Sequence, residues 1–122
     1  MSRTIIAVVD DMFFAAKIRA TAEALNVEIA FPRNHDVLIG KLIELKPDLI
    51  LVDLHNQKID PIELARHLKS REEFAAVSML GFFSHVQTDV QRAALEAGYD
   101  QVIPRSVFSR DLAEILTGPK AV

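Results

Sequence analysis

The stretch Leu49-Ile-Leu-Val52, followed directly by Asp53, decides the fold of this 122-residue chain. Four consecutive apolar residues are typical of a strand that is buried on both faces of a parallel sheet. Similar runs occur at residues 5–9 and 77–83. The sequence therefore predicts several interior strands in one parallel sheet.

Two shorter runs, at residues 27–31 and 101–103, bring the predicted strands to five. In residues 27–31 the apolar side chains alternate with Glu28 and Ala30, which favours an edge strand. Between the runs, apolar residues recur at spacings of three and four, which indicates helices with one buried face. Because strands that alternate with helices are joined by right-handed crossovers, we expect one α/β domain with helices on both faces of the sheet.

Helix boundaries are marked by capping residues. Asp60-Pro61 predicts a helix start, since aspartate caps helices and proline suits their first position. Gly98 is a natural helix terminator. The sequence Thr117-Gly118 ends the last predicted helix, so we expect a single domain over residues 1–122, with its core at about 4–117 and a short tail at 118–122.

The composition excludes several classes of protein. Half of the residues are hydrophobic and a quarter are charged, which is typical of a packed globule. The absence of cysteine excludes disulfides and thiolate zinc sites, and it suits a reducing compartment. No apolar stretch approaches the ~20 residues of a membrane span, and a net charge of −3 disfavours nucleic-acid binding. We expect a cytoplasmic domain that binds neither membrane nor nucleic acid.

Polar side chains follow four of the predicted strands. In chain order they are Asp10 and Asp11, then Asp53, Ser84 and Arg105. Doubly wound sheets bind ligands outside the carboxyl ends of their strands, so these side chains are the candidate site. Clustered carboxylates repel one another, so at neutral pH they need a cation or a raised pKa. One or two carboxylates with several waters suit Mg²⁺. A carboxylate beside Mg²⁺ can attack a phosphoryl group.

The chain resembles the receiver domain of bacterial response regulators, of the CheY-like superfamily, over about residues 4–116. The matching stretches are Ile-Ile-Ala-Val-Val-Asp10-Asp11, Pro-Asp-Leu-Ile-Leu-Val-Asp53-Leu, Ala-Leu-Glu-Ala-Gly98 and Val-Ile-Pro-Arg105-Ser-Val-Phe108. The resemblance implies a flavodoxin-like, doubly wound, five-stranded parallel sheet of order 2-1-3-4-5.

The resemblance also implies roles for the residues of the site. Asp53 stands at the phospho-acceptor position, and Asp10 and Asp11 at the metal-binding pair. In the family, the backbone carbonyl two residues after the acceptor also binds the metal, which here is the carbonyl of His55. The implied function is that of a stand-alone receiver in two-component signalling. It would be no enzyme beyond its own phosphorylation and dephosphorylation, and Mg²⁺ would be needed only for that chemistry.

Several positions depart from the family pattern. Arg105 replaces the lysine that contacts the phosphoryl group, and its planar guanidinium differs from a compact ammonium. Val102 stands where an aromatic switch residue is expected. The family has a hydroxyl-bearing switch residue at the end of the fourth strand, and this position corresponds to Gly81 or to Ser84. Only Ser84 carries a hydroxyl. The alternative is therefore a pseudo-receiver that acts as a protein-interaction module without phosphorylation.

The expected partners follow from the same resemblance. A histidine kinase or phosphotransfer protein would supply the phosphoryl group. A downstream protein would bind the surface of the helix that ends at Gly98, the strand at 101–103 and the last helix, and a homodimer on this face is an alternative. A metal-assisted hydrolase is a third interpretation, but the sequence shows neither a substrate cavity nor a base.

Individual side chains also have alternative interpretations. Asp10 and Asp11 could cap the first helix instead of binding metal. Arg105 could form an ion pair with Asp53 instead of binding phosphate. Two of the four histidines, His55 and His85, fall near the expected site and leave zinc as an alternative metal. The other two, at positions 35 and 67, fall on separate predicted helices or their caps and show no ligand spacing.

Overall fold

The computed structural model describes residues 3–84 and 88–118, so His85 and most of the expected tail lie outside the described residues. The strands are β1 (Thr4–Val8), β2 (Glu28–Ala30), β3 (Leu49–Asp53), β4 (Ser78–Phe83) and β5 (Gln101–Pro104). The helices are α1 (Met12–Ala24), α2 (His35–Leu45), α3 (Pro61–Ser70), α4 (Thr88–Ala97), α5 (Arg105–Arg110) and α6 (Leu112–Thr117). Within the described ranges, no helix is both long and apolar enough to cross a bilayer.

The predicted topology is confirmed. All five strands are parallel and lie in the order β2-β1-β3-β4-β5. The central strand β3 pairs with β1 and β4, and every one of its residues is buried, as its uninterrupted apolar sequence predicts. The alternating run at 27–31 forms β2, which is an edge strand.

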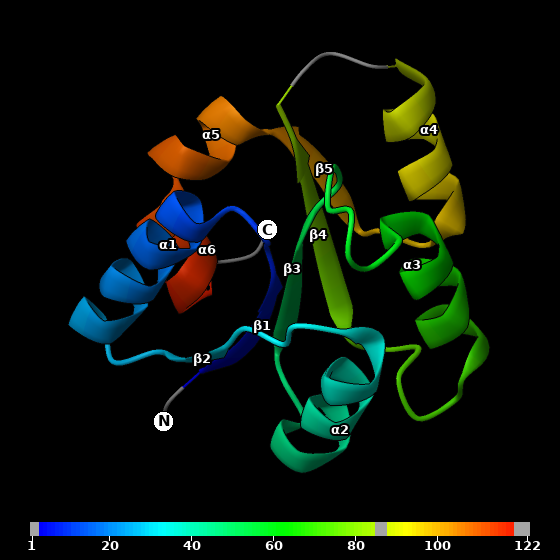
Figure 1. The fold of residues 1–122 in the computed structure, drawn as a ribbon, viewed down its shortest axis with the longest axis horizontal. Helices are drawn as coiled ribbons and strands as arrows, with labels where there is room; N and C mark the ends of the chain where they lie inside the picture. The colour runs from blue at the N-terminus through cyan, green and yellow to red at the C-terminus, as the bar shows by residue number, and fades with distance from the viewer. Residues whose placement is uncertain (1–2, 85–87, 119–122) are drawn as a thin grey trace.

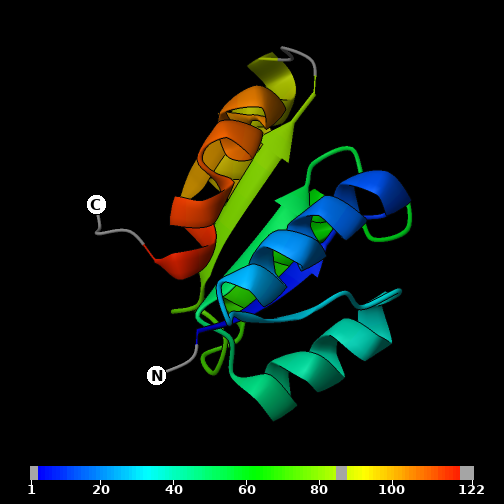
Figure 2. The same cartoon turned by 90° about the vertical axis from the view of Figure 1, so that its left-hand side faces the viewer.

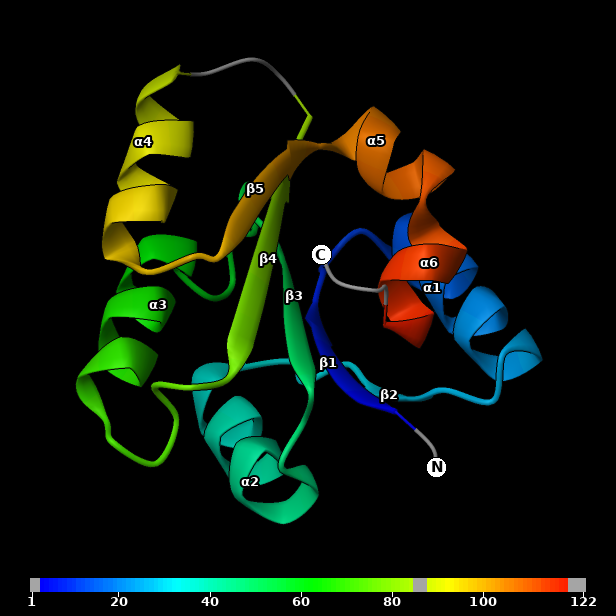
Figure 3. The same cartoon turned by 180° about the vertical axis from the view of Figure 1, so that it is seen from behind.

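Helices cover both faces of the sheet (Figure 1). In Figure 2, α1, α5 and α6 lie in front of the sheet. Figure 3, which shows the molecule of Figure 1 from behind, has these three helices to the right of the sheet and α2, α3 and α4 to the left. These three helices share a core with alternate residues of the strands, including Phe14, Phe82 and Phe108. The helices α2, α3 and α4 share the core of the other face, which includes Leu38, Leu64 and Leu68. The sheet therefore separates the hydrophobic core into two parts.

Capping residues act where the sequence predicts them, with one difference. Asp60 caps α3 by accepting the N–H groups of Ile62 and Glu63, and Gly98 follows α4 with a φ of 124°. The single last helix expected from the sequence is instead divided into α5 and α6 at Asp111, whose φ of −102° and ψ of 18° are not helical. Aspartate favours helix ends over helix interiors, which accounts for a break at this residue.

Candidate functional site

The candidate site lies where the carboxyl ends of the parallel strands meet (Figure 1). Asp53 is the last residue of β3, and Asp10 and Asp11 connect β1 to α1. Ser84 follows β4, and Arg105 begins α5 directly after β5. We call Asp10, Asp11 and Asp53 the acidic edge. Five side chains that are distant in sequence thus follow the ends of four strands of one sheet.

Asp53 is the buried member of the acidic edge, with only 6% of its surface exposed. Its Oδ1 accepts the backbone N–H of His55 at 2.9 Å. Burial raises the pKa of Asp53, and the charge of Asp10 acts in the same direction. The N–H of His55 and the charges of His55 and Arg105 oppose this rise in pKa. The ionised carboxylate is therefore costly in the folded protein, and a bound cation would favour it.

Asp11 caps α1 and also binds Arg105. Its Oδ1 accepts the backbone N–H groups of Phe13 at 3.0 Å and Phe14 at 3.1 Å. Its Oδ2 lies 3.1 Å from Nη2 of Arg105, and both side chains are about one-third exposed. The N–H of Phe14 and then the guanidinium lower the pKa of Asp11. The structure therefore gives Asp11 the capping role and pairs Arg105 with Asp11 instead of Asp53.

The guanidinium of Arg105 rests on an aromatic cluster. Its Cζ lies 3.8 Å from the ring centroid of Phe14, a geometry that favours a cation–π interaction. The Phe14 ring contacts Phe82 and Phe108, which stack on one another with centroids 4.4 Å apart. Phe82 is the β4 residue that pairs with Asp53. The position of Arg105 is thus set by the same core that positions Asp53.

Asn56 fixes the loop after Asp53, and sequence reasoning missed it. Its side chain is buried, and its Oδ1 accepts the N–H groups of Lys58 at 2.8 Å and Ile59 at 2.9 Å. Its Nδ2 donates to the carbonyl of Val8 at the end of β1, at 3.4 Å. An asparagine between a strand end and a helix cap is the sequence signal for such a turn.

Asp10 approaches the same loop. Its Oδ2 accepts the backbone N–H of Gln57 at 3.4 Å, which directs this carboxylate across to the connection after β3. The charge of Asp10 adds to the rise in the pKa of Asp53, of which burial is the largest cause. Asp10 and Asp53 are therefore the two carboxylates of the acidic edge that act on one another.

The acidic edge does not assemble as a three-carboxylate metal centre. Among the described residues, no group of three or more histidine, aspartate or glutamate side chains is arranged to hold a metal ion. The reason is local, because Asp11 is directed to its own helix and to Arg105. Mg²⁺ requires only one or two carboxylates and keeps several waters. The carboxylate oxygens of Asp10 and Asp53 are of the kind that suits Mg²⁺, while those of Asp11 are engaged by α1 and by Arg105.

The fourth strand places the candidate switch residues apart from one another. Gly81 lies inside β4 and pairs with Val52, and a Cβ added there would lie 2.8 Å from Leu54. Ser84 follows the strand and is exposed. The residue that ends β4 is the buried Phe83, one position beyond the partner of Asp53. The strand end at the acidic edge is thus aromatic, and the nearby hydroxyl of Ser84 faces solvent.

The pair of histidines that the structure brings together is not the pair that the sequence suggested. His55 lies in the turn after Asp53 and is partly buried, and the suggested zinc site with His85 falls outside the described residues. In contrast, His35 and His67, which show no ligand spacing in the sequence, lie with ring centroids 5.2 Å apart. Sequence spacing could not reveal this contact, because the two residues belong to different helices.

Comparison with known proteins gives similarity in sequence and in fold. No family model matches the chain. Response regulator protein VraR of Staphylococcus aureus is 33% identical over 76 residues, which cover 62% of this chain and 35% of VraR. The match thus spans about a third of the length of this curated relative.

Solved structures match almost the whole chain. The signal receiver domain of a DNA-binding response regulator from Colwellia psychrerythraea 34H has a TM-score of 0.80 at 17% identity, covering 96% of this chain and 100% of that domain. The receiver domain of a response regulator from Bermanella marisrubri has a TM-score of 0.79 at 21% identity, covering 97% and 100%. The Mn²⁺-bound form of response regulator Rcp1 has a TM-score of 0.70 at 22% identity, covering 95% and 90%. These likenesses establish a shared fold.

Proposed function

We propose that this chain, which has the fold of response-regulator receiver domains, is a signalling module that accepts a phosphoryl group on Asp53. The observation that carries the proposal is the position of Asp53. Asp53 is the last residue of the central strand, and only 6% of its surface is exposed. Its Oδ1 accepts the backbone N–H of His55. A carboxylate fixed at the carboxyl edge of such a sheet is suited to attack an incoming ligand.

The proposed reaction is a displacement at phosphorus. An ionised oxygen of Asp53 attacks the phosphorus of a phosphohistidine or of a small acyl phosphate. A new O–P bond forms while the bond from phosphorus to the donor breaks, and its electron pair leaves with the donor. The hydrogen bond from His55 orients the attacking carboxylate. Arg105 exchanges Asp11 for the phosphoryl oxygens and neutralises their charge.

Asp10 and Asp53 would hold Mg²⁺ for this reaction, with the backbone carbonyl of His55 as a third donor. When bound, Mg²⁺ neutralises charge on the transferring phosphoryl group. The interaction between the charges of Asp10 and Asp53 supports this assignment. The Mn²⁺-bound form of the similar protein Rcp1 supports divalent-metal binding in this fold.

The proposed partners are a histidine kinase or phosphotransfer protein as donor, and a downstream protein. The downstream protein would bind the face of α4, β5 and α5, with a homodimer on that face as the alternative. This places the module in the cytoplasm, where such kinases present their phosphohistidine.

A phosphorylation-independent interaction module is the second candidate function. It is favoured by one specific observation, the ion pair of Arg105 with Asp11 on the ring of Phe14. In this contact the guanidinium of Arg105 already has an anionic partner, which is the place that a phosphoryl group would otherwise take. In a pseudo-receiver the pair would be permanent, and the partner would recognise a single conformation.

Incubation with acetyl phosphate and Mg²⁺, followed by intact-mass measurement, tests the two functions. We expect the wild-type chain to gain one phosphoryl group and Asp53→Asn to gain none. Asp48→Asn is the matched control, because Asp48 is an exposed aspartate directly before the start of the same strand. Beryllofluoride with Mg²⁺ should shift amide resonances around Asp53. Absence of both the adduct and these shifts in the wild-type chain would contradict phosphorylation and favour the interaction module.

A further inference from the structure

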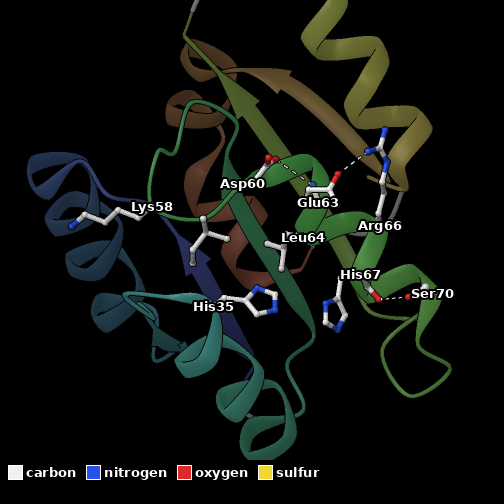
Figure 4. Close-up of a pocket in the computed structure, with 9 residues that line it drawn as sticks. His35, Lys58, Asp60, Glu63, Leu64, Arg66, His67 and Ser70 are labelled. Atoms are coloured by element: carbon white, nitrogen blue, oxygen red, sulfur yellow. Dashed lines mark hydrogen bonds and ion pairs between the residues drawn. The ribbon is translucent and has the colours of Figure 1, made fainter.

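A pocket of about 540 Å³ is lined by residues of α3, by the first residue of α2 and by the loop between β3 and α3 (Figure 4). His35 and His67 contribute to its lining, and their rings face one another across it. The ring centroids lie 5.2 Å apart, and the ring planes are inclined by 46°. Residues that are 32 positions apart thus present two imidazoles to one solvent-accessible space.

The backbone positions of both histidines are fixed by local structure. Asn34 caps α2 by accepting the N–H of Val37 at 2.9 Å, which makes His35 the first residue of that helix. His67 lies on α3 between Leu64 and Leu68, which are both almost completely buried. These leucines belong to the core that α2 also shares. The two rings therefore approach one another because α2 and α3 pack on the same face of the sheet.

The two imidazoles have their nitrogens available. Both side chains are partly exposed, and neither imidazole makes a hydrogen bond to any residue in the ranges 3–84 and 88–118. The neighbouring carboxylates have partners. Glu63 Oε2 lies 2.8 Å from Nη1 of Arg66, and Asp60 caps α3. The imidazole nitrogens are thus the available donors of this pocket.

We propose that His35 and His67 form a two-histidine site for a divalent late transition metal ion, represented by Zn²⁺ or Ni²⁺. With Zn–N bonds of about 2.0 Å and tetrahedral geometry, two imidazoles on one ion have ring centroids roughly 5 Å apart. The observed spacing of 5.2 Å agrees with this requirement. Water completes the coordination, because no third histidine, aspartate or glutamate among the described residues joins the two in a metal-binding group.

The chemistry of the donors separates this site from the acidic edge. Imidazole nitrogen suits Zn²⁺, Ni²⁺ and Cu²⁺, whereas carboxylate and carbonyl oxygens suit Mg²⁺. Two protein ligands hold zinc less firmly than the four of a structural zinc site. We therefore expect reversible binding that responds to the concentration of the free metal ion. The inference does not depend on phosphorylation of Asp53.

Calorimetric titration of the whole chain with Zn²⁺ and with Ni²⁺ tests the proposal. We expect one ion per chain, and a loss of affinity of at least about tenfold in His35→Asn and in His67→Asn, since even changes beyond the ligand shell cost that much. Ser70→Ala, which lines the same pocket, and Asp53→Asn should bind Zn²⁺ as the wild-type chain does. Equal Zn²⁺ affinity in the wild-type chain and both histidine variants would overturn the proposal.

A second measurement on the wild-type chain does not depend on the folding of any variant. Paramagnetic Ni²⁺ should broaden the imidazole resonances of His35 and His67 before those of the other two histidines. Simultaneous broadening of all four, or broadening of His55 first, would overturn the assignment to this pocket. Titration with Mg²⁺ should leave the His35 and His67 resonances sharp and unshifted.

Discussion

Nη2 of Arg105 lies 3.1 Å from Oδ2 of Asp11, while the buried carboxylate of Asp53 is held by a backbone N–H of its own loop. The positive charge of the site is therefore held by its capping aspartate and not by the candidate acceptor. The pair is about one-third exposed, so water competes with it and its contribution to stability is small. An incoming phosphoryl group can displace Asp11 from Arg105 at modest cost.

Replacement of Arg105 should change the rate of phosphorylation more than the fold. Arg105→Ala should slow labelling by acetyl phosphate at least about tenfold, because a cation that stabilises the transferring group is lost. Arg105→Lys should retain labelling, since it keeps the charge. Intact-mass time courses at a fixed Mg²⁺ concentration measure both rates. Equal rates in the alanine variant and the wild-type chain would show that Arg105 takes no part in the transfer.

Asp53→Asn should stabilise the protein in the absence of metal. Burial raises the pKa of Asp53 above its ordinary value of 3.8, so ionising it costs more in the folded than in the unfolded chain. The wild-type chain therefore loses stability relative to the variant as the pH rises above that value. At neutral pH we expect the variant to be more stable by about 1 kcal/mol, as is usual when a functional group is removed.

Urea denaturation at several pH values between about 4 and 7 measures this difference. The stability gap between Asp53→Asn and the wild-type chain should narrow toward the acidic end. A constant gap, or a less stable variant at neutral pH, would contradict a raised pKa of Asp53. Mg²⁺ should stabilise the wild-type chain and not the variant, because Asp53 is one of the proposed ligands.

Truncation of two adjacent phenylalanines should affect the free energy of unfolding to very different extents. Phe14 is 7% exposed and contacts Phe82, Phe108 and Arg105, whereas Phe13 is 92% exposed. Phe14→Ala should cost about 3–5 kcal/mol, because it opens a cavity in the aromatic cluster. Phe13→Ala should change stability by less than about 0.5 kcal/mol. Thermal melting followed by circular dichroism compares the two, and equal losses would refute the aromatic support beneath Arg105.

Two glycines provide a test of packing around β4. An added Cβ at Gly81 would lie 2.8 Å from Cδ2 of Leu54, while one at Gly40 meets nothing within 4 Å. Gly81→Ala should therefore cost about 1–3 kcal/mol through overpacking. Gly40→Ala lies inside α2 and should stabilise by about 0.5–1 kcal/mol. Denaturant unfolding measures both, and the cost at Gly81 should shrink when Leu54→Ala is added.

The sequence was sufficient for the backbone and for the elements that carry the site. Runs of apolar residues predict the strands, because burial on both faces of β3 leaves no room for polar side chains. The capping role of Asp60 also follows from its neighbours in sequence. These features depend on local pattern, and the structure reproduces them.

Contacts between distant side chains could not be predicted in the same way. The sequence suggested Asp53 as the ion-pair partner of Arg105, whereas Arg105 pairs with Asp11 and lies over the ring of Phe14. The approach of His35 to His67 depends on how α2 and α3 each pack on the same face of the sheet. Both outcomes are set by packing in three dimensions, which residue spacing along the chain does not encode.

The division of the core by the sheet places the packing beneath Arg105 and the packing beneath the histidine pair on opposite faces. The aromatic cluster beneath Arg105 belongs to the face of α1, α5 and α6, whereas His67 lies between two leucines of α3 that pack on the opposite face. Substitutions without shared partners have additive effects on stability. Selection could therefore remove phosphoryl chemistry from this chain and retain the histidine pair, or the reverse. One small domain would then carry two responses with separate evolutionary histories.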